Sequence, residues 1–450
     1  MRKPSPILGL AFTLATLWSP LVAAQTTLPS GPIGTTLEDF FTAALDYSPQ
    51  LKIAEESMKI GSARKRVATG RLLPQLNATA NVSDNRRYTS DPTQPGLREF
   101  DGKRYTLQLS QVLFHWQTFS QRNQAELVED QLEAEYFGEL AFLFSDVAEK
   151  YFNVLQAEDA IESIESELDA VNNQLNQIQS MYDRQLAQIT DLYQAQASVA
   201  AVESEKLQLQ SELALRQEAL RSVTGLSAGP LYRLSDDAEV PPLENSINYW
   251  VQQAREGNHQ IRAAEYQLQV ATERISESRG AYMPRVSLIL QKQDSNVGFE
   301  NAPVSQNENT YLGLDVTIPL YAGGSNRAAV SEAHSQELIA EYQLQQLQLE
   351  TNERVRNAYL QVQSSELRTE AAEKLLESTS LSATAAQRGF ELGAVTNVDV
   401  LNALRDQFQA ERDLQRARYE HVIYNLILKR EAGILSAEDM LEVGSWLEAP

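Results

Sequence analysis

Apolar residues along this chain follow two different periods, and the change between them marks out its segments. From about residue 36 to residue 70 they recur at helical spacing, and Pro74 then ends the helical pattern, as Pro284 does later in the chain. Beyond each proline, apolar and polar residues alternate, as in a strand with one apolar face. The alternating apolar positions are Leu76, Ala78, Ala80 and Val82, Tyr105, Leu107 and Leu109, Val286, Leu288 and Leu290, and Leu312, Leu314, Val316, Ile318 and Leu320. They predict two β-hairpins, near residues 74–114 and 284–321, with polar loops at residues 84–102 and 295–309.

Long helices are predicted after both hairpins. Between Phe119 and Arg184 there is no proline, and apolar residues recur at steps of three and four with Glu158 as the only charged interruption, which is the pattern of a coiled-coil seam. A helix of this length is a rod of roughly 100 Å. Short turns at residues 186–188 and 392–394 lead into returning helices that start near Thr190 and Thr396.

The whole order occurs twice, which indicates a tandem duplication. A shift of 210 residues places Leu37, Phe40 and Pro74 over Ile247, Trp250 and Pro284. The predicted segments are a signal peptide at residues 1–24, a first structural repeat at 25–229, a linker at 230–244, a second repeat at 245–435 and an acidic tail at 436–450.

Composition narrows the class of protein. Arg2 and Lys3 precede an apolar run that ends in small residues before Gln25, as in an export signal. The 450 residues include no cysteine, which excludes disulfides, zinc-thiolate sites, a catalytic cysteine and a lipidated cysteine. With 61 acidic and 38 basic residues the formal charge is −23, which argues against non-specific binding to nucleic acid.

Strands that are apolar on one face and polar on the other suit a transmembrane β-barrel. Four strands cannot close a barrel, so two or three chains would have to contribute, and twelve strands favour an open conduit. The alternative is a soluble periplasmic coiled-coil structural or adaptor protein whose hairpins pack their apolar faces on helices.

Two further segments point to a family. Tyr321-Ala322-Gly323-Gly324 follows the last strand, and a helix turn reads Leu392-Gly393-Ala394-Val395-Thr396-Asn397-Val398-Asp399-Val400-Leu401. Together with the duplicated order, these segments resemble the TolC family of outer-membrane export ducts over essentially the whole mature chain.

The resemblance implies a mixed α/β membrane protein of the outer membrane with a periplasmic extension. Its fold would be a homotrimer, with twelve antiparallel transmembrane strands in one barrel embedded in outer-membrane lipid and a long α-helical coiled-coil tunnel in the periplasm. Its function would be that of a passive channel-tunnel in a tripartite efflux or type I secretion system. A periplasmic adaptor (membrane fusion) protein would couple it to an inner-membrane transporter.

The resemblance also implies a constricted entrance at the helix turns, where acidic residues form rings. The matching positions are Asp191, Asp399 and Asn402, the last being an asparagine where the family usually has aspartate. Phe390 and Val395 stand where some members have a tyrosine and an arginine that hold the entrance closed. Two structural alternatives stay open: Thr396 and Asp399 fit a capping box, and Asp191 suits the positive end of a helix dipole.

Catalytic chemistry finds little support. Gly225-Leu226-Ser227-Ala228-Gly229 has the letters of a nucleophile elbow, but it follows a predicted helix, whereas the elbow requires a strand before it. His115, His259, His334 and His421 lack the spacing of a metal site. We therefore expect no enzyme activity, catalytic residue, metal, cofactor or nucleic-acid partner.

Overall fold

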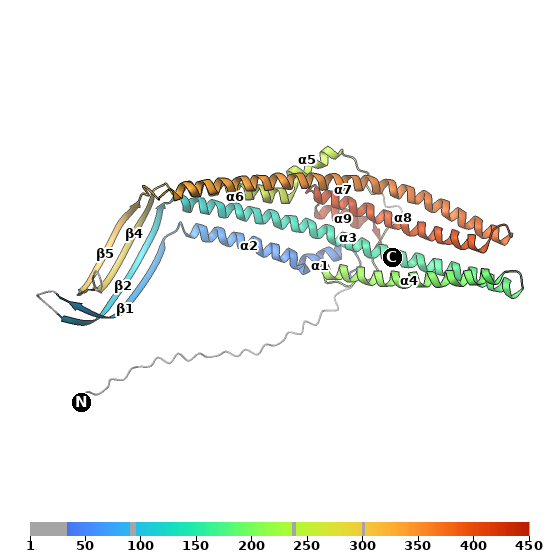
Figure 1. Cartoon of the computed structure of the whole chain (residues 1–450), viewed down its shortest axis with the longest axis horizontal. Helices are drawn as coiled ribbons and strands as arrows, with labels where there is room; N and C mark the ends of the chain where they lie inside the picture. The colour runs from blue at the N-terminus through green and yellow to red at the C-terminus, as the bar shows by residue number, and fades with distance from the viewer. Residues whose placement is uncertain (1–33, 91–95, 236–239, 299–301, 450) are drawn as a thin grey trace, which may run out of the picture.

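The protein is a long rod with a β-sheet at one end and paired helices along the rest (Figure 1). The structure, a computed structural model, describes residues 34–90, 96–235, 240–298 and 302–449. The predicted signal peptide at residues 1–24 lies outside these residues. No helix in the described ranges has the length and apolar character needed to cross a membrane.

The helices come in the same order in each half of the chain. The first half contains α1 (Leu37–Tyr47), α2 (Pro49–Gly70), α3 (Trp116–Asp183) and α4 (Ile189–Thr224); the second contains α5 (Ile247–Gly257), α6 (His259–Gly280), α7 (Ser325–Glu391) and α8 (Asn397–Glu431), followed by α9 (Ala437–Ser445). The sequence predicted one helix over residues 36–70, and this was wrong in one respect. Ser48 caps a new helix with its side chain, and Pro49 occupies the first turn, so α1 and α2 are separate helices.

Four antiparallel strands form the sheet, in the order β1-β2-β4-β5. They are β1 (Gln75–Thr89), β2 (Gly96–Phe114), β4 (Arg285–Val297) and β5 (Pro303–Thr317). The predicted loops at residues 84–102 and 295–309 were therefore mostly wrong, because strand pairing continues well beyond the apolar positions. A polar strand satisfies its backbone groups in the ladder as well as an apolar one does, and its side chains resemble those of a loop.

The register places the apolar residues of all four strands on one face. Leu76 lies opposite Leu109, Leu109 opposite Leu290, and Leu290 opposite Leu312. This face is uncovered, since Leu312 and Leu314 are 68% and 61% exposed. The alternative in which the hairpins pack their apolar faces on helices was therefore wrong for this chain. The other face is polar, and Ser287 and Ser295 are buried on it. Because the sheet is curved (Figure 1), this burial indicates that the polar face is the concave one.

The main core lies midway along the rod, where α1, α3, α8 and α9 meet. Phe40, Tyr151 and Phe152 are fully buried there, and the Tyr151 hydroxyl donates a hydrogen bond to the Tyr232 carbonyl at 2.8 Å. The predicted seam on α3 continues beyond the core through Ile164, Val171 and Ile178, which are all buried. Glu158 is not its only charged interruption, because Glu167 is also buried on this stripe.

The predicted tail at residues 436–450 is folded, at least as far as the structure describes it. Ser436 and Asp439 form a capping box at the start of α9, and Met440 and Val443 enter the core. A short strand, β6 (Leu447–Glu448), pairs with β3 (Arg233–Leu234) in the predicted linker. Linker and tail therefore hold each other against the helices.

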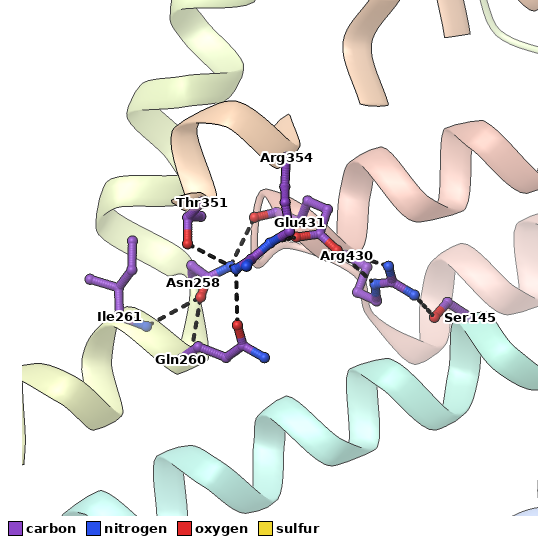
Figure 2. A network of polar contacts seen from close by, with 8 residues as sticks. All are labelled: Ser145, Asn258, Gln260, Ile261, Thr351, Arg354, Arg430 and Glu431. Carbon is purple, nitrogen blue, oxygen red and sulfur yellow. Dashed lines mark hydrogen bonds and ion pairs between the residues drawn. The ribbon is translucent and has the colours of Figure 1, made fainter. Parts of the chain in front are cut away.

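A polar network fastens the second half of the chain at the break between α5 and α6 (Figure 2). The Asn258 side chain accepts from the amides of Gln260 and Ile261 and donates to the Glu431 carbonyl. Arg354 on α7 and Arg430 on α8 both bind the Glu431 carboxylate. The equivalent break in the first half is capped by Ser48, whose hydroxyl accepts from the Leu51 amide. The repeats thus share a backbone plan but not the groups that secure it.

Candidate functional site at the helix turns

Both long helix pairs reverse direction at the end of the rod remote from the sheet (Figure 1). The α3–α4 turn contains Gln185 with φ 61°, and the α7–α8 turn contains Gly393 with φ 72°. A left-handed residue closes a helix end tightly, at some cost when the residue is not glycine. The predicted site residues lie on or beside these two turns.

Asp399 is the N3 residue of a capping box at the start of α8. Its carboxylate Oδ2 accepts from the Thr396 backbone amide at 2.8 Å and from the Thr396 hydroxyl at 2.6 Å, and its own amide donates to the Thr396 hydroxyl at 3.3 Å. These hydrogen bonds, with the Thr396 hydroxyl foremost, lower the pKa of Asp399. The side chain is also exposed, so the same carboxylate caps the helix and presents a negative charge at the tip.

Asp191 holds the same place at the start of α4. Its Oδ2 accepts from the Gln188 backbone amide at 3.2 Å, and it lies in the first turn of the helix. This side chain is half-buried, whereas Asp399 is exposed. The two turns therefore use one capping device in two different environments.

The remaining predicted residues divide into one exposed and two packed side chains. Asn402 is exposed and lies one turn beyond Asp399. Phe390 and Val395 pack against Val400 and Leu404 in a small apolar cluster between α7 and α8. Apolar contact, rather than polar bonding, therefore holds these two positions in the turn.

Two residues missed by the sequence interpretation join the turns to each other. The Gln174 side-chain amide on α3 donates to the Asn397 side-chain oxygen at 2.8 Å, and the Asn397 amide donates to the Asp191 carbonyl at 3.3 Å. Both side chains are nearly fully buried. A buried amide pair with its partners in place fixes one arrangement of its surroundings. The sequence signal was the polar residue Gln174 on a largely apolar stripe.

A buried ion pair lies farther from the tip. Arg412 on α8 donates to Glu167 on α3 at 2.9 Å and to Glu205 on α4 at 3.4 Å. Burial raises the pKa of Glu167, and the bond from Arg412 opposes that rise. This cluster joins α3, α4 and α8 on the sheet side of the turns. The helical pattern of the sequence alone does not show which charged residues pair.

Two other arrangements singled out by the sequence lack their required geometry among the described residues. Gly225, with φ 72°, is the C-cap that ends α4, so residues 225–229 lack the preceding strand that a nucleophile elbow needs. Across the described ranges, no group of three or more His, Cys, Asp or Glu side chains is placed to hold a metal ion. What the turns do present to solvent is the negative charge of Asp399.

Comparison with known proteins gives a consistent picture. The sequence model of the family described as "Outer membrane efflux protein" matches residues 41–226 and 250–433. The chain is 27% identical over 430 residues to the outer membrane protein TolC of Vibrio cholerae, covering 95% of this chain and 97% of that protein. It is 26% identical over 418 residues to the alkaline protease secretion protein AprF of Pseudomonas aeruginosa, covering 90% and 85% of the two chains.

Solved structures show the same fold. A crystal structure of CusC superposes with a TM-score of 0.78 at 20% identity, covering 88% of this chain and 92% of that one. The outer membrane protein VceC of Vibrio cholerae superposes with a TM-score of 0.75 at 19% identity, covering 88% and 96%.

Proposed function

This chain belongs to the outer membrane efflux protein family, which includes TolC, and we propose that it is the trimeric outer-membrane duct of a tripartite efflux or type I secretion system. It is an outer-membrane protein with the TolC-like fold of a sheet joined to a helical tunnel. The number of chains, the partners and the roles of individual residues are the parts that we propose.

The observation that carries the proposal is a sheet with an uncovered apolar face and two open edges. In the order β1-β2-β4-β5, the outer edges of β1 and β5 have no partner strand among the described residues. Lipid accepts an apolar face, but it cannot satisfy unpaired backbone groups. Pairing β5 of one copy with β1 of the next removes both edges, and three copies close a barrel of twelve strands that leaves a channel.

The helices support the same assembly. On α7, Leu360, Leu367 and Leu381 are exposed on the face opposite the buried Val355, Ala358 and Val362. Exposed leucines at this spacing on a long helix, interrupted by Lys374, favour a further helix that covers them. In the proposed trimer, helices of the neighbouring copies cover them and complete the tunnel wall.

The helix turns then form the periplasmic entrance. Three copies of Asp399, each one turn from Asn402, surround the opening. The half-buried Asp191 caps the start of α4 beside it. Phe390 and Val395 hold the α7–α8 turn by packing, and the Gln174–Asn397 pair supplies a polar tie between the two turns. A periplasmic adaptor protein docks on this end, an inner-membrane transporter supplies the energy, and the chain itself catalyses no reaction.

A pair of arginine substitutions tests the barrel. Leu312→Arg places a charge on the apolar face of β5. Gln291→Arg is the matched control on the polar face, at nearly the same depth, because Gln291 follows Leu290, the residue opposite Leu312. Near the bilayer midplane the first change should cost about 2–4 kcal/mol, and the second should cost far less. We expect loss of heat-modifiable trimer from outer-membrane extracts for Leu312→Arg only. Equal yields of trimer for the two variants, or recovery of neither variant from the outer membrane, would overturn the proposed barrel.

A further inference from the structure

The charged side chains on the polar face of the sheet are mostly arginines, whereas the apolar face carries charges of both signs. At the hairpin end of β1 and β2, Arg87 lies directly opposite Arg98. By strand alternation, both belong to the concave polar face. On the apolar face next to them, Asp84 lies opposite Asp101 and Arg86 pairs with Glu99. The ends of the strands are therefore basic on the concave side, while the other side, which also carries Lys103, has charges of both signs.

The concave face contains almost no carboxylate to balance its arginines. Over the described strands it carries Arg87, Arg98, Arg104 and Arg285 against one acidic residue, Asp315, which gives a net charge of +3 per chain. Asp315 and Arg285 lie near the helix end of the sheet, far from the arginine pair. This positive surface is conspicuous in a chain whose formal charge is −23.

The arginines at the hairpin end have no acidic partner within the described residues. Arg87 and Arg98 make no ion pair there, although like charges placed opposite each other destabilise a strand pair. Arg104 donates to the carbonyls of Val297 and Gly298 at 3.2 and 3.4 Å, and both of these acceptors are neutral. A cavity of about 840 Å³ beside Arg104 is lined by other neutral polar groups, among them Gln293, Asn307 and Asn309.

Closure of the proposed trimer would gather these groups without neutralising them. The gathering of arginines around one opening rests on the proposed function, because the concave face becomes the channel lining only in a closed barrel. The strand that would meet β1 is β5 of the next copy, whose concave face near its hairpin end carries Ser305, Asn307 and Asn309. Each copy therefore adds arginines to the ring and no carboxylate from its described strands, and low-dielectric walls strengthen the resulting field.

We propose that the ring of Arg87, Arg98 and Arg104 is an anion-binding site at the outer mouth of the channel, selective for multivalent phosphate or carboxylate groups. Guanidinium groups bind such oxyanions through paired, charge-assisted hydrogen bonds. The acidic periplasmic entrance and the basic outer mouth then form two zones of opposite charge along one duct. An anionic group that leaves the tunnel meets attraction at its exit.

Planar-bilayer recording of the purified full-length trimer tests the site, with inorganic tripolyphosphate as the probe added on the hairpin side. The wild type should show a reversible reduction of conductance. Arg87→Gln combined with Arg98→Gln should raise the midpoint by about tenfold or more, because each lost contact to a charged group is substantial. Arg86→Gln is the matched control, since it removes an adjacent arginine from the other face and should leave the midpoint unchanged. Tripolyphosphate added on the helix side should be a weaker blocker.

The outcomes separate this inference from the proposed function. A heat-stable trimer that conducts, but whose midpoint is the same in the wild type and the double variant, would overturn the anion site and leave the duct intact. Absence of any block of the wild type would do the same. Failure of the wild type itself to form conducting trimers would count against the proposed function. If the double variant assembles poorly, Arg98→Gln alone, at an exposed position, gives the same comparison with a smaller expected shift.

Discussion

Helices α3 and α7 occupy the same place in the two repeats, yet their surroundings differ. They have 68 and 67 residues. Helix α3 packs against α2, α4, α6 and α8 and buries large side chains such as Tyr151 and Phe152, whereas α7 packs against α5, α6 and α8 and buries mostly small ones. Helix α3 is therefore enclosed by other helices of the same chain, whereas α7 has leucines on its far face that no helix of the same chain covers among the described residues.

The largest expected effect comes from the buried ion pair that helps to place α3 inside. Arg412→Ala leaves Glu167 buried without its partner and should cost about 3–5 kcal/mol of unfolding free energy. Arg405→Ala, which removes an exposed partner of Asp406 on the same helix, should cost at most about 1 kcal/mol. Urea unfolding followed by helical circular dichroism in detergent measures both. Similar costs for the two variants would show that α3 does not depend on this pair.

A second pair of variants separates packing within one chain from packing between chains. Leu168→Asp on α3 changes a half-buried residue of the helix seam and should cost roughly 2–4 kcal/mol in the stability of the single chain. Leu360→Asp on α7 changes a residue that is 53% exposed, so a single chain should tolerate it while the trimer is lost.

Size-exclusion chromatography and proteolysis of the two variants distinguish these effects. Leu360→Asp should give a folded, protease-resistant protein of smaller size, and Leu168→Asp a protease-sensitive helical region. A stable trimer of Leu360→Asp would mean that the exposed face of α7 lies outside the subunit contact.

The smallest expected effect concerns the paired caps at the turns. Three exposed copies of Asp399 should attract a trivalent cation added on the helix side, so Asp399→Ala should raise the midpoint of block by about tenfold. Asp191→Ala, at the half-buried equivalent, should change it little, and Asn402→Asp should lower it. An unchanged midpoint for Asp399→Ala would show that the residue caps α8 and does not bind cations.

The sequence was informative wherever one period extended over many residues. The long helices were predicted to within a few residues, because seams such as Ile164, Val171 and Ile178 recur at helical spacing. The strand faces were also predicted, since Leu312 and Leu314 alternate with polar residues. The ends of the strands were not, because a paired polar strand near Arg87 and a polar loop have the same composition.

Contacts between distant segments lay beyond what the sequence could reveal. The Thr396 and Asp399 capping box is local and was found from its spacing. The Gln174–Asn397 pair joins residues 223 positions apart. No sequence pattern around either residue predicts which residue it contacts. The two helix turns could therefore be located from the sequence, while the bonds that hold them together required the structure.

The central claim is that three chains close one barrel through β1 and β5, and disulfide cross-linking tests it most directly. The chain has no cysteine of its own, so engineered pairs act without background. Cysteines scanned along the two edges, such as Ala80→Cys on β1 with Thr310→Cys on β5, should form disulfides between chains where the registers meet. Oxidation of intact outer membranes should then yield a ladder that ends at a covalent trimer. A ladder that ends at the dimer, or monomers at every register, would contradict the account.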